Sequence, residues 1–164
     1  MEISGLYKEL SVIILGALPI SEVRGAIPTA IFVYQFPPWK ASILAVTGNI
    51  IAGLSVFIVL KYLSEFIVRR SNQAKKIFSW LFEHTKKRHT GHFKRYKYSF
   101  WALFIFIAMP LPLTGAWSGA IAAVIFGMPP KVAALAIVSG VSVAGIIVII
   151  LSQAGNIFLT QNLF

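Results

Sequence analysis

Two charged residues that could do chemistry stand close together in an apolar segment near the start of the chain. The stretch LPISEVRGAIP, residues 18–28, places Glu22 and Arg24 between Pro19 and Pro28. An ionisable side chain at membrane depth is costly and is therefore a functional candidate. A carboxylate can carry a proton, and a guanidinium can bind a phosphate or carboxylate through two parallel hydrogen bonds. These two residues are the first candidates for binding an anion and a proton.

The composition places this segment in a membrane protein. The chain has 164 residues, of which 57% are hydrophobic and only 12% are charged, and it contains no cysteine. Residues 41–60, 99–130 and 132–164 carry no charge, and each tract is at least as long as the ~20 residues that a spanning helix needs. We therefore expect an all-α integral membrane protein of the cell membrane, with a single multi-pass membrane domain over residues 1–164.

The positive charge is concentrated in one block. The formal net charge is +10, and most of the 15 lysines and arginines lie between Lys61 and Lys97. A basic block between apolar halves is typical of a cytoplasmic loop, so nucleic acid is not an expected partner. Within residues 69–98, apolar residues recur at helical spacing, which predicts a basic amphipathic helix on the cytoplasmic membrane surface, in contact with lipids. Both termini are then predicted to be extracytoplasmic.

The chain contains an internal repeat. A shift of 92 residues gives nine identities in the 24 positions from Pro37 to Leu60, including a Pro-Pro and an Ala-Gly pair. We predict a first repeat at 10–60 and a second at 100–152. Each begins with a broken apolar segment, 10–36 or 100–127, and ends with a span, 39–60 or 131–152.

The broken segments predict short helices that cannot cross a membrane alone. We expect a helix to end near Pro19 and the next to begin at Pro28, and nine helical residues rise only ~13 Å of a ~30 Å hydrocarbon core. In the second repeat, Pro110 and Pro112 would end one helix and Thr114 would cap the next. Each segment is therefore predicted to be a re-entrant helical hairpin, which makes the repeat inverted. The alternative, two kinked spans, gives a parallel repeat.

The second helix of each hairpin would begin at its tip, so two positive helix N-termini would meet near the midplane beside Arg24. This arrangement predicts an anion site in which Glu22 gains and loses a proton as its surroundings change. The structural alternative is a polar network that only satisfies the hairpin tips. Asn49 either completes the polar lining or forms a helix–helix hydrogen bond, and Trp117 is interpreted as an interface or packing aromatic. The predicted substrate- and proton-binding residues are Glu22, Arg24, Gly25, Asn49, Thr114 and Gly115.

The stretches LPISEVRGAIP and MPLPLTGAWSGA, together with the repeat and the basic linker, resemble the small multi-drug export protein family over nearly the whole chain. That family is distantly similar to the DedA-type membrane proteins. The resemblance implies two re-entrant hairpins, spanning helices and a role in transport. DedA-type relatives imply proton-dependent movement of lipid phosphates and typically have an arginine in the second hairpin. Here the second hairpin is uncharged, and the hairpin arginine is Arg24.

Three classes of function follow. The first is a proton-coupled transporter of an anionic substrate, with a flippase for a lipid phosphate as one form of it. The second is an exporter of cationic drugs that uses Glu22, which Arg24 disfavours because a guanidinium two residues away repels a cation. The third is a membrane-organising scaffold without a substrate. We expect no enzyme, cofactor or metal site, since no nucleophile–base pair or metal cluster is apparent; a homo-oligomer stays open.

Overall fold

The structure is a computed structural model that describes residues 2–70, 92–111 and 114–163, with side chains described over 5–66, 99–111 and 114–155. Every element in these ranges is helical, which confirms the all-α prediction. Two helices are long and apolar enough to cross a membrane, over Pro38–Phe66 and Pro130–Gly155. The elements are α1 (Glu2–Ala17), α2 (Glu22–Pro28), the π-helix η1 (Thr29–Val33), α3 (Pro38–Arg70), α5 (His92–Ala108), α6 (Ala116–Ile125) and α7 (Pro130–Leu163).

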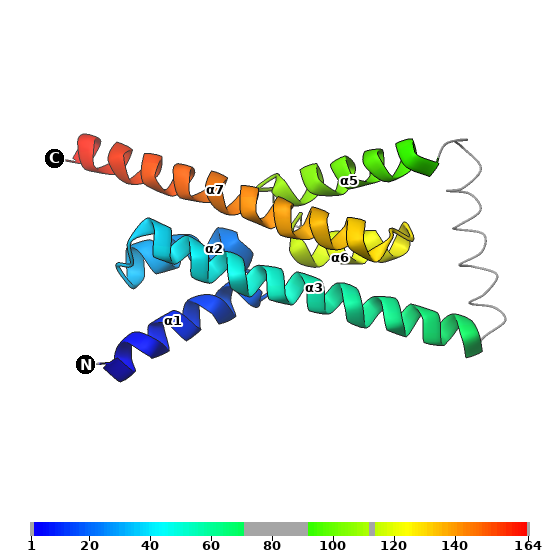
Figure 1. The fold of residues 1–164 in the computed structure, drawn as a ribbon. Coiled ribbons are helices and arrows are strands. Elements are labelled where there is room, and N and C mark those ends of the chain that lie inside the picture. The colour runs from blue at the N-terminus through cyan, green and yellow to red at the C-terminus, as the bar shows by residue number, and fades with distance from the viewer. Residues whose placement is uncertain (1, 71–91, 112–113, 164) are drawn as a thin grey trace.

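Two long helices and two pairs of short helices make up the fold (Figure 1). Helices α3 and α7 run in opposite directions and contact each other. At the end of the bundle where α7 finishes, here called the terminal end, α1 runs inward and α2 with η1 turns back. At the opposite end, where α3 finishes and which we call the linker end, α5 runs inward and α6 turns back. Each pair packs against both long helices.

The first broken segment differs from its prediction in where its second helix begins. Helix α1 ends at Ala17, just before Pro19, as predicted, but its start at Glu2 lies well upstream of residue 10. The prediction that Pro28 begins the next helix was wrong, because α2 begins at Glu22 and Pro28 lies at its end. Proline lacks the N–H that an α-helix requires there, and the hydrogen-bond ladder widens into η1 immediately afterwards.

The second broken segment also needs one correction. Helix α5 ends at Ala108, before Pro110, as predicted, whereas Pro112 lies outside the described residues. The prediction that Thr114 caps the next helix was wrong, because α6 has Gly115 at its N-cap. The Thr114 hydroxyl instead contacts the carbonyl oxygens of Met109 and Leu111, at 2.8 and 2.9 Å. The hydroxyl is therefore turned away from the N–H groups that it was expected to cap.

The long helices begin close to where the sequence places them and end later. Both start at the second proline of a Pro-Pro pair, where the missing N–H has no helical partner. They continue past residues 60 and 152, the ends predicted for the two spans. Most of the predicted linker helix over 69–98 falls on residues 71–91, which lie outside the described residues. Of the remainder, 69–70 end α3 and 92–98 begin α5.

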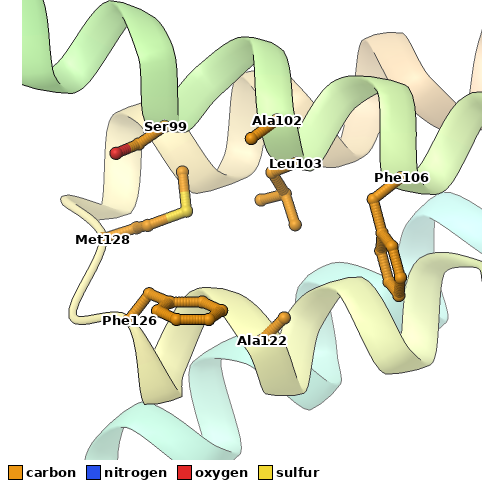
Figure 2. A pocket seen from close by; sticks show the side chains of 7 residues that line it. All are labelled: Ser99, Ala102, Leu103, Phe106, Ala122, Phe126 and Met128. Carbon is orange, nitrogen blue, oxygen red and sulfur yellow. The ribbon is translucent and has the colours of Figure 1, made fainter. Parts of the chain in front are cut away.

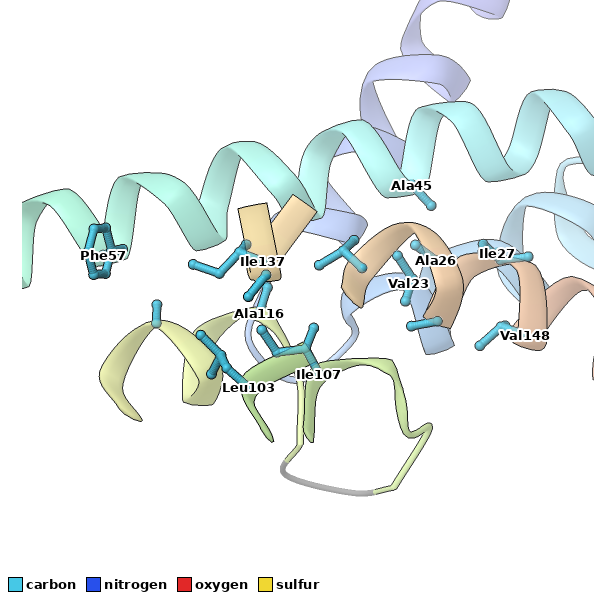
Figure 3. Packing of buried hydrophobic residues seen from close by; sticks show 14 of the residues in the cluster. Val23, Ala26, Ile27, Ala45, Phe57, Leu103, Ile107, Ala116, Ile137 and Val148 are labelled. Carbon is cyan, nitrogen blue, oxygen red and sulfur yellow. The ribbon is translucent and has the colours of Figure 1, made fainter. Parts of the chain in front are cut away.

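Close packing of small residues fixes the short helices on the long ones. A Cβ added at Gly16 would meet the backbone of Ala45, and one added at Gly48 would meet the backbone of Ile13, so α1 and α3 touch through their backbones. The interior is filled by alanines and β-branched residues from all of the helices, as Figure 3 shows for part of it.

At the terminal end, the Lys40 ammonium also lies 2.5 Å from the carboxylate of Glu9.

Each of the two long helices makes a close contact with the other half of the chain through a glycine. Gly53 of α3 leaves no room for a Cβ beside Ala116 of α6. Gly145, which the 92-residue shift aligns with Gly53, is as crowded beside Val46 of α3 and also approaches Ile27 of α2. Each long helix therefore carries a glycine at its contact with the other half of the chain.

Candidate functional site

The two breaks meet in the middle of the bundle. One is the segment 18–21 between α1 and α2. The other lies between α5 and α6, and its described residues are 109–111 and 114–115. The indole N–H of Trp117, at the start of α6, donates a hydrogen bond of 3.0 Å to the carbonyl of Ala17, at the end of α1. Residues that lie about one hundred positions apart in the sequence are therefore joined where both short pairs turn.

Glu22 lies at the N-terminus of the opposite short helix. Its side chain is 6% exposed, and its carboxylate accepts a hydrogen bond of 3.4 Å from the backbone N–H of Trp117. The backbone N–H of Ala116 also interacts favourably with the same carboxylate. These are groups that a helix leaves without an internal partner, and the helix dipole favours a negative charge there. Glu22 thus caps α6 from across the bundle.

Two backbone features hold Glu22 in this position. Glu22 has φ 47°, in the left-handed region that non-glycine residues rarely adopt. Gly115 lies so close to the Glu22 carboxylate that an added Cβ would overlap it. Strained backbone of this kind persists where the surroundings determine it, and it is frequent at functional sites.

Arg24 is bound by the second break rather than by a carboxylate. Its Nη1 donates to the carbonyl of Leu111, and its Nη2 donates to the carbonyl of Met109 at 3.0 Å and to Oγ1 of Thr114 at 3.2 Å. Its Nε is buried without a hydrogen-bond partner. Within the described residues, no ion pair joins Arg24 to Glu22. The guanidinium charge is therefore held by neutral acceptors, which an anion could replace.

Two pockets adjoin these residues. The first, which we call the break pocket, has a volume of about 490 Å³ and is lined by Pro19, Ile20, Ser21, Glu22, Arg24, Trp117, Ser118 and Ile121. The second, the α7 pocket, has a volume of about 430 Å³ and is lined by Arg24, Pro28, Phe32, Pro110, Val148, Leu151, Ser152 and Gly155. Each is large enough for a small organic anion.

Of the other residues predicted for the site, two lie in it and two lie outside the pockets. Thr114 and Gly115 contact Arg24 and Glu22 directly, as described above. Gly25 lies in α2, beside Ser21 of the first break, and lines neither pocket. Asn49 is 1% exposed and its Oδ1 has no hydrogen-bond partner. It lies on α3 about one turn from Gly53, and therefore on the face that meets the start of α6.

Two residues of this centre were not found from the sequence. Trp117 lines the break pocket and also holds both Glu22 and the end of α1, so the packing interpretation was incomplete. Ser118 lines the same pocket, and its hydroxyl accepts a hydrogen bond of 2.9 Å from the N–H of Gly115. The available signal was their position in the first turn after a break, where backbone N–H groups lack helical partners.

A third pocket lies apart from the charged residues. It has a volume of about 510 Å³ and opens between α5 and α6 (Figure 2). Among the residues whose side chains the structure describes, the pocket is lined by Ser99 and by six apolar residues: Ala102, Leu103, Phe106, Ala122, Phe126 and Met128. The described lining of this pocket can therefore accept apolar groups.

One comparison with known proteins gives a match. The family model described as "Putative small multi-drug export protein" matches residues 22–147. The matched region starts at Glu22 and includes both charged residues of the centre, the second break and the start of α6. Comparisons with curated proteins and with solved structures give no match.

Proposed function

The chain belongs to the small multi-drug export protein family, and from this membership and the geometry of the two breaks we propose that it is a proton-coupled membrane transporter of anions. One observation carries the proposal. The Glu22 carboxylate lies against the N-terminal N–H groups of α6, close to the guanidinium of Arg24. This is a place where a phosphate or carboxylate of a substrate would bind.

Competition for that place provides the coupling. While Glu22 is ionised, its carboxylate satisfies the N–H groups of Trp117 and Ala116 and excludes a second anion by charge repulsion. Protonation of Glu22 removes that charge and leaves Arg24 and the start of α6 with a net positive field. A substrate anion then replaces the neutral carboxyl group at the start of α6, so one proton accompanies each anion. Return of the proton to water restores the cap and expels the substrate.

We also propose that both short pairs are re-entrant hairpins in an inverted repeat, 10–60 and 100–152. Helix α1 has 16 residues and α6 has 10, which correspond to about 24 and 15 Å of rise and fall short of a ~30 Å hydrocarbon core. The pairs run inward from opposite ends of the bundle (Figure 1). The matching contacts of Gly53 and Gly145 with the opposite half support a two-fold relation between the repeats.

This topology gives a labelling prediction. Single cysteines replace Ser4 and Ser71 in a chain that has no native cysteine, and an impermeant thiol reagent is applied to intact cells and to inverted vesicles. The proposal expects Ser4→Cys to react from outside and Ser71→Cys from the cytoplasm, because α3 crosses once between them. Reaction of both from the same face would favour two kinked spans and reject the inverted repeat.

A second candidate function is export of cationic drugs. The break pocket places the Glu22 carboxylate beside the side chain of Trp117, and a carboxylate with an aromatic ring is a combination that binds organic cations. Arg24 lines the same pocket and opposes a cation there. We therefore place this candidate second, although it fits the description of the family.

Flux measurements in proteoliposomes decide between the candidates. The panel contains inorganic phosphate, acetate, a long-chain alkyl phosphate and the cationic dye ethidium, each with and without an imposed pH gradient. We expect the wild type to accumulate one of the anions when the gradient is imposed. Glu22→Gln keeps the shape of the side chain but cannot titrate, so it should exchange the same anion without responding to the gradient.

Each outcome has a separate meaning. Accumulation of ethidium in place of the anions would overturn the proposal in favour of the cation exporter. Accumulation by Glu22→Gln in response to the gradient would remove Glu22 from the coupling. Absence of flux for the whole panel would favour the scaffold. Uptake of the alkyl phosphate alone would point to a lipid phosphate, the substrate that the distant DedA-type resemblance implies.

A further inference from the structure

Among the residues that the structure describes, Arg24 is the one that lines both the break pocket and the α7 pocket. The two pockets are otherwise formed by different parts of the chain. The break pocket lies between the first break and the start of α6, and the α7 pocket lies between α2 with η1 and the second half of α7. Together the two pockets cross the middle of the bundle, and Arg24 lies between them.

The two pockets extend toward opposite ends of the bundle. Helix α6 runs from the middle toward the linker end (Figure 1), and the break pocket follows it from Trp117 to Ile121. Helix α7 runs toward the terminal end, as α2 with η1 does, and the α7 pocket follows them from Arg24 to Phe32 and Gly155. A path through both pockets would therefore run along the bundle and be interrupted at Arg24.

We propose that Arg24 is the partition between two half-sites that open to opposite faces of the membrane, and that the substrate passes when its anionic group replaces the carbonyls of the second break as the partner of the guanidinium. The inference rests on the proposed function for the nature of the substrate. The partition itself is a property of the bundle and can be tested without any substrate.

The hydrogen bonds of Arg24 are of a kind that an arriving anion can replace, which would open the partition. Its two terminal nitrogens donate hydrogen bonds to the second break, at the carbonyls of Met109 and Leu111 and the hydroxyl of Thr114. These are neutral acceptors, whereas an anion adds a Coulomb attraction to the guanidinium and can accept two parallel hydrogen bonds from it. An arriving anion can therefore take the guanidinium from the second break, while a neutral solute cannot. The buried Nε, which has no partner in the described structure, offers a further donor to such an anion.

The test uses cysteine accessibility in the full-length chain. Ser118→Cys reports on the break pocket and Ser152→Cys on the α7 pocket, since each serine lines one of them. A small charged, impermeant thiol reagent is added to one face at a time of reconstituted vesicles with a known orientation. With Arg24 present, we expect Ser118→Cys to react from the linker-end face and Ser152→Cys from the terminal-end face.

Removal of the guanidinium should abolish this sidedness. In an Arg24→Ala background, each cysteine should react from the far face at least tenfold faster than with Arg24 present. Thr114→Val removes one of the acceptors with little change in shape and should give a smaller increase, which keeps the test usable where Arg24→Ala fails to fold. Lys40→Ala is the matched control, because Lys40 is a cation bound to Glu9 and lines neither pocket.

Two results would overturn the inference. One is reaction of both cysteines from the same face with Arg24 present, which would show that the pockets do not open to opposite faces. The other is unchanged sidedness in both the Arg24→Ala and Thr114→Val backgrounds. Neither result depends on a flux measurement. If no anion of the panel is transported but the sidedness of labelling is lost without Arg24, the proposed function is rejected and the partition is supported.

Discussion

Replacing Arg24 with alanine should reduce gradient-driven uptake of the transported anion by at least about 100-fold. A hydrogen bond to a charged group contributes about 1.5–3 kcal/mol, so loss of two such bonds from a guanidinium to an anion corresponds to a factor of this order. The same change removes one donor from each of the carbonyls of Met109 and Leu111, which the Thr114 hydroxyl also contacts. The measurement is the initial rate of uptake, under an imposed pH gradient, of the panel anion that the wild type accumulates.

Two further variants separate charge from geometry. Arg24→Lys keeps the positive charge but loses the planar fork, so it should recover only part of the rate. Lys40→Ala removes a different cation, one that pairs with Glu9 at the terminal end, and it should retain uptake close to that of the wild type. Equal losses in Arg24→Ala and Lys40→Ala would attribute the effect to general damage, and wild-type uptake by Arg24→Ala would reject the anion site.

Proline positions made much of the architecture predictable from the sequence. Pro19 and Pro110 each follow the end of a helix, and each Pro-Pro pair begins a long helix, because proline lacks an N–H and restricts the residue before it. These effects act over a few residues and need no knowledge of the rest of the fold. Pro28 shows where the rule stops, since tertiary contacts hold the chain helical up to it and the strain passes into η1.

The hydrogen-bond partners of the site residues could not be predicted from local sequence. The sequence singled out Glu22 and Arg24 by their charge, yet their partners lie 85 to 95 positions further along the chain. Thr114 illustrates the difficulty: its place before a helix predicts a cap, but its hydroxyl contacts Arg24 and the carbonyl of Met109, which lies earlier in the same break. Local preference is overridden where a buried charge needs acceptors.

Replacing Gly115 with alanine is the second change for which we expect a large effect. The backbone at Gly115 has φ −175°, which any residue can adopt, so the change introduces no backbone strain. The added methyl group would instead overlap the carboxylate of Glu22 and push it from the N-terminus of α6. Overpacking of a filled site typically costs about 1–3 kcal/mol. We expect gradient-driven uptake to fall by at least about tenfold, measured as the initial rate in proteoliposomes.

A second-site change makes this prediction specific to Glu22. Glu22→Asp shortens the side chain by one methylene and creates space beside Gly115, so the double variant Gly115→Ala, Glu22→Asp should recover part of the uptake that Gly115→Ala alone has lost. Gly5→Ala is the matched control, because a Cβ there would meet nothing within 4 Å. Wild-type uptake by Gly115→Ala would show that the carboxylate need not lie at the start of α6 for transport. If the double variant has even lower uptake than Gly115→Ala, the loss of uptake does not come from the overlap with Glu22. That result would contradict the competition between the carboxylate and the substrate.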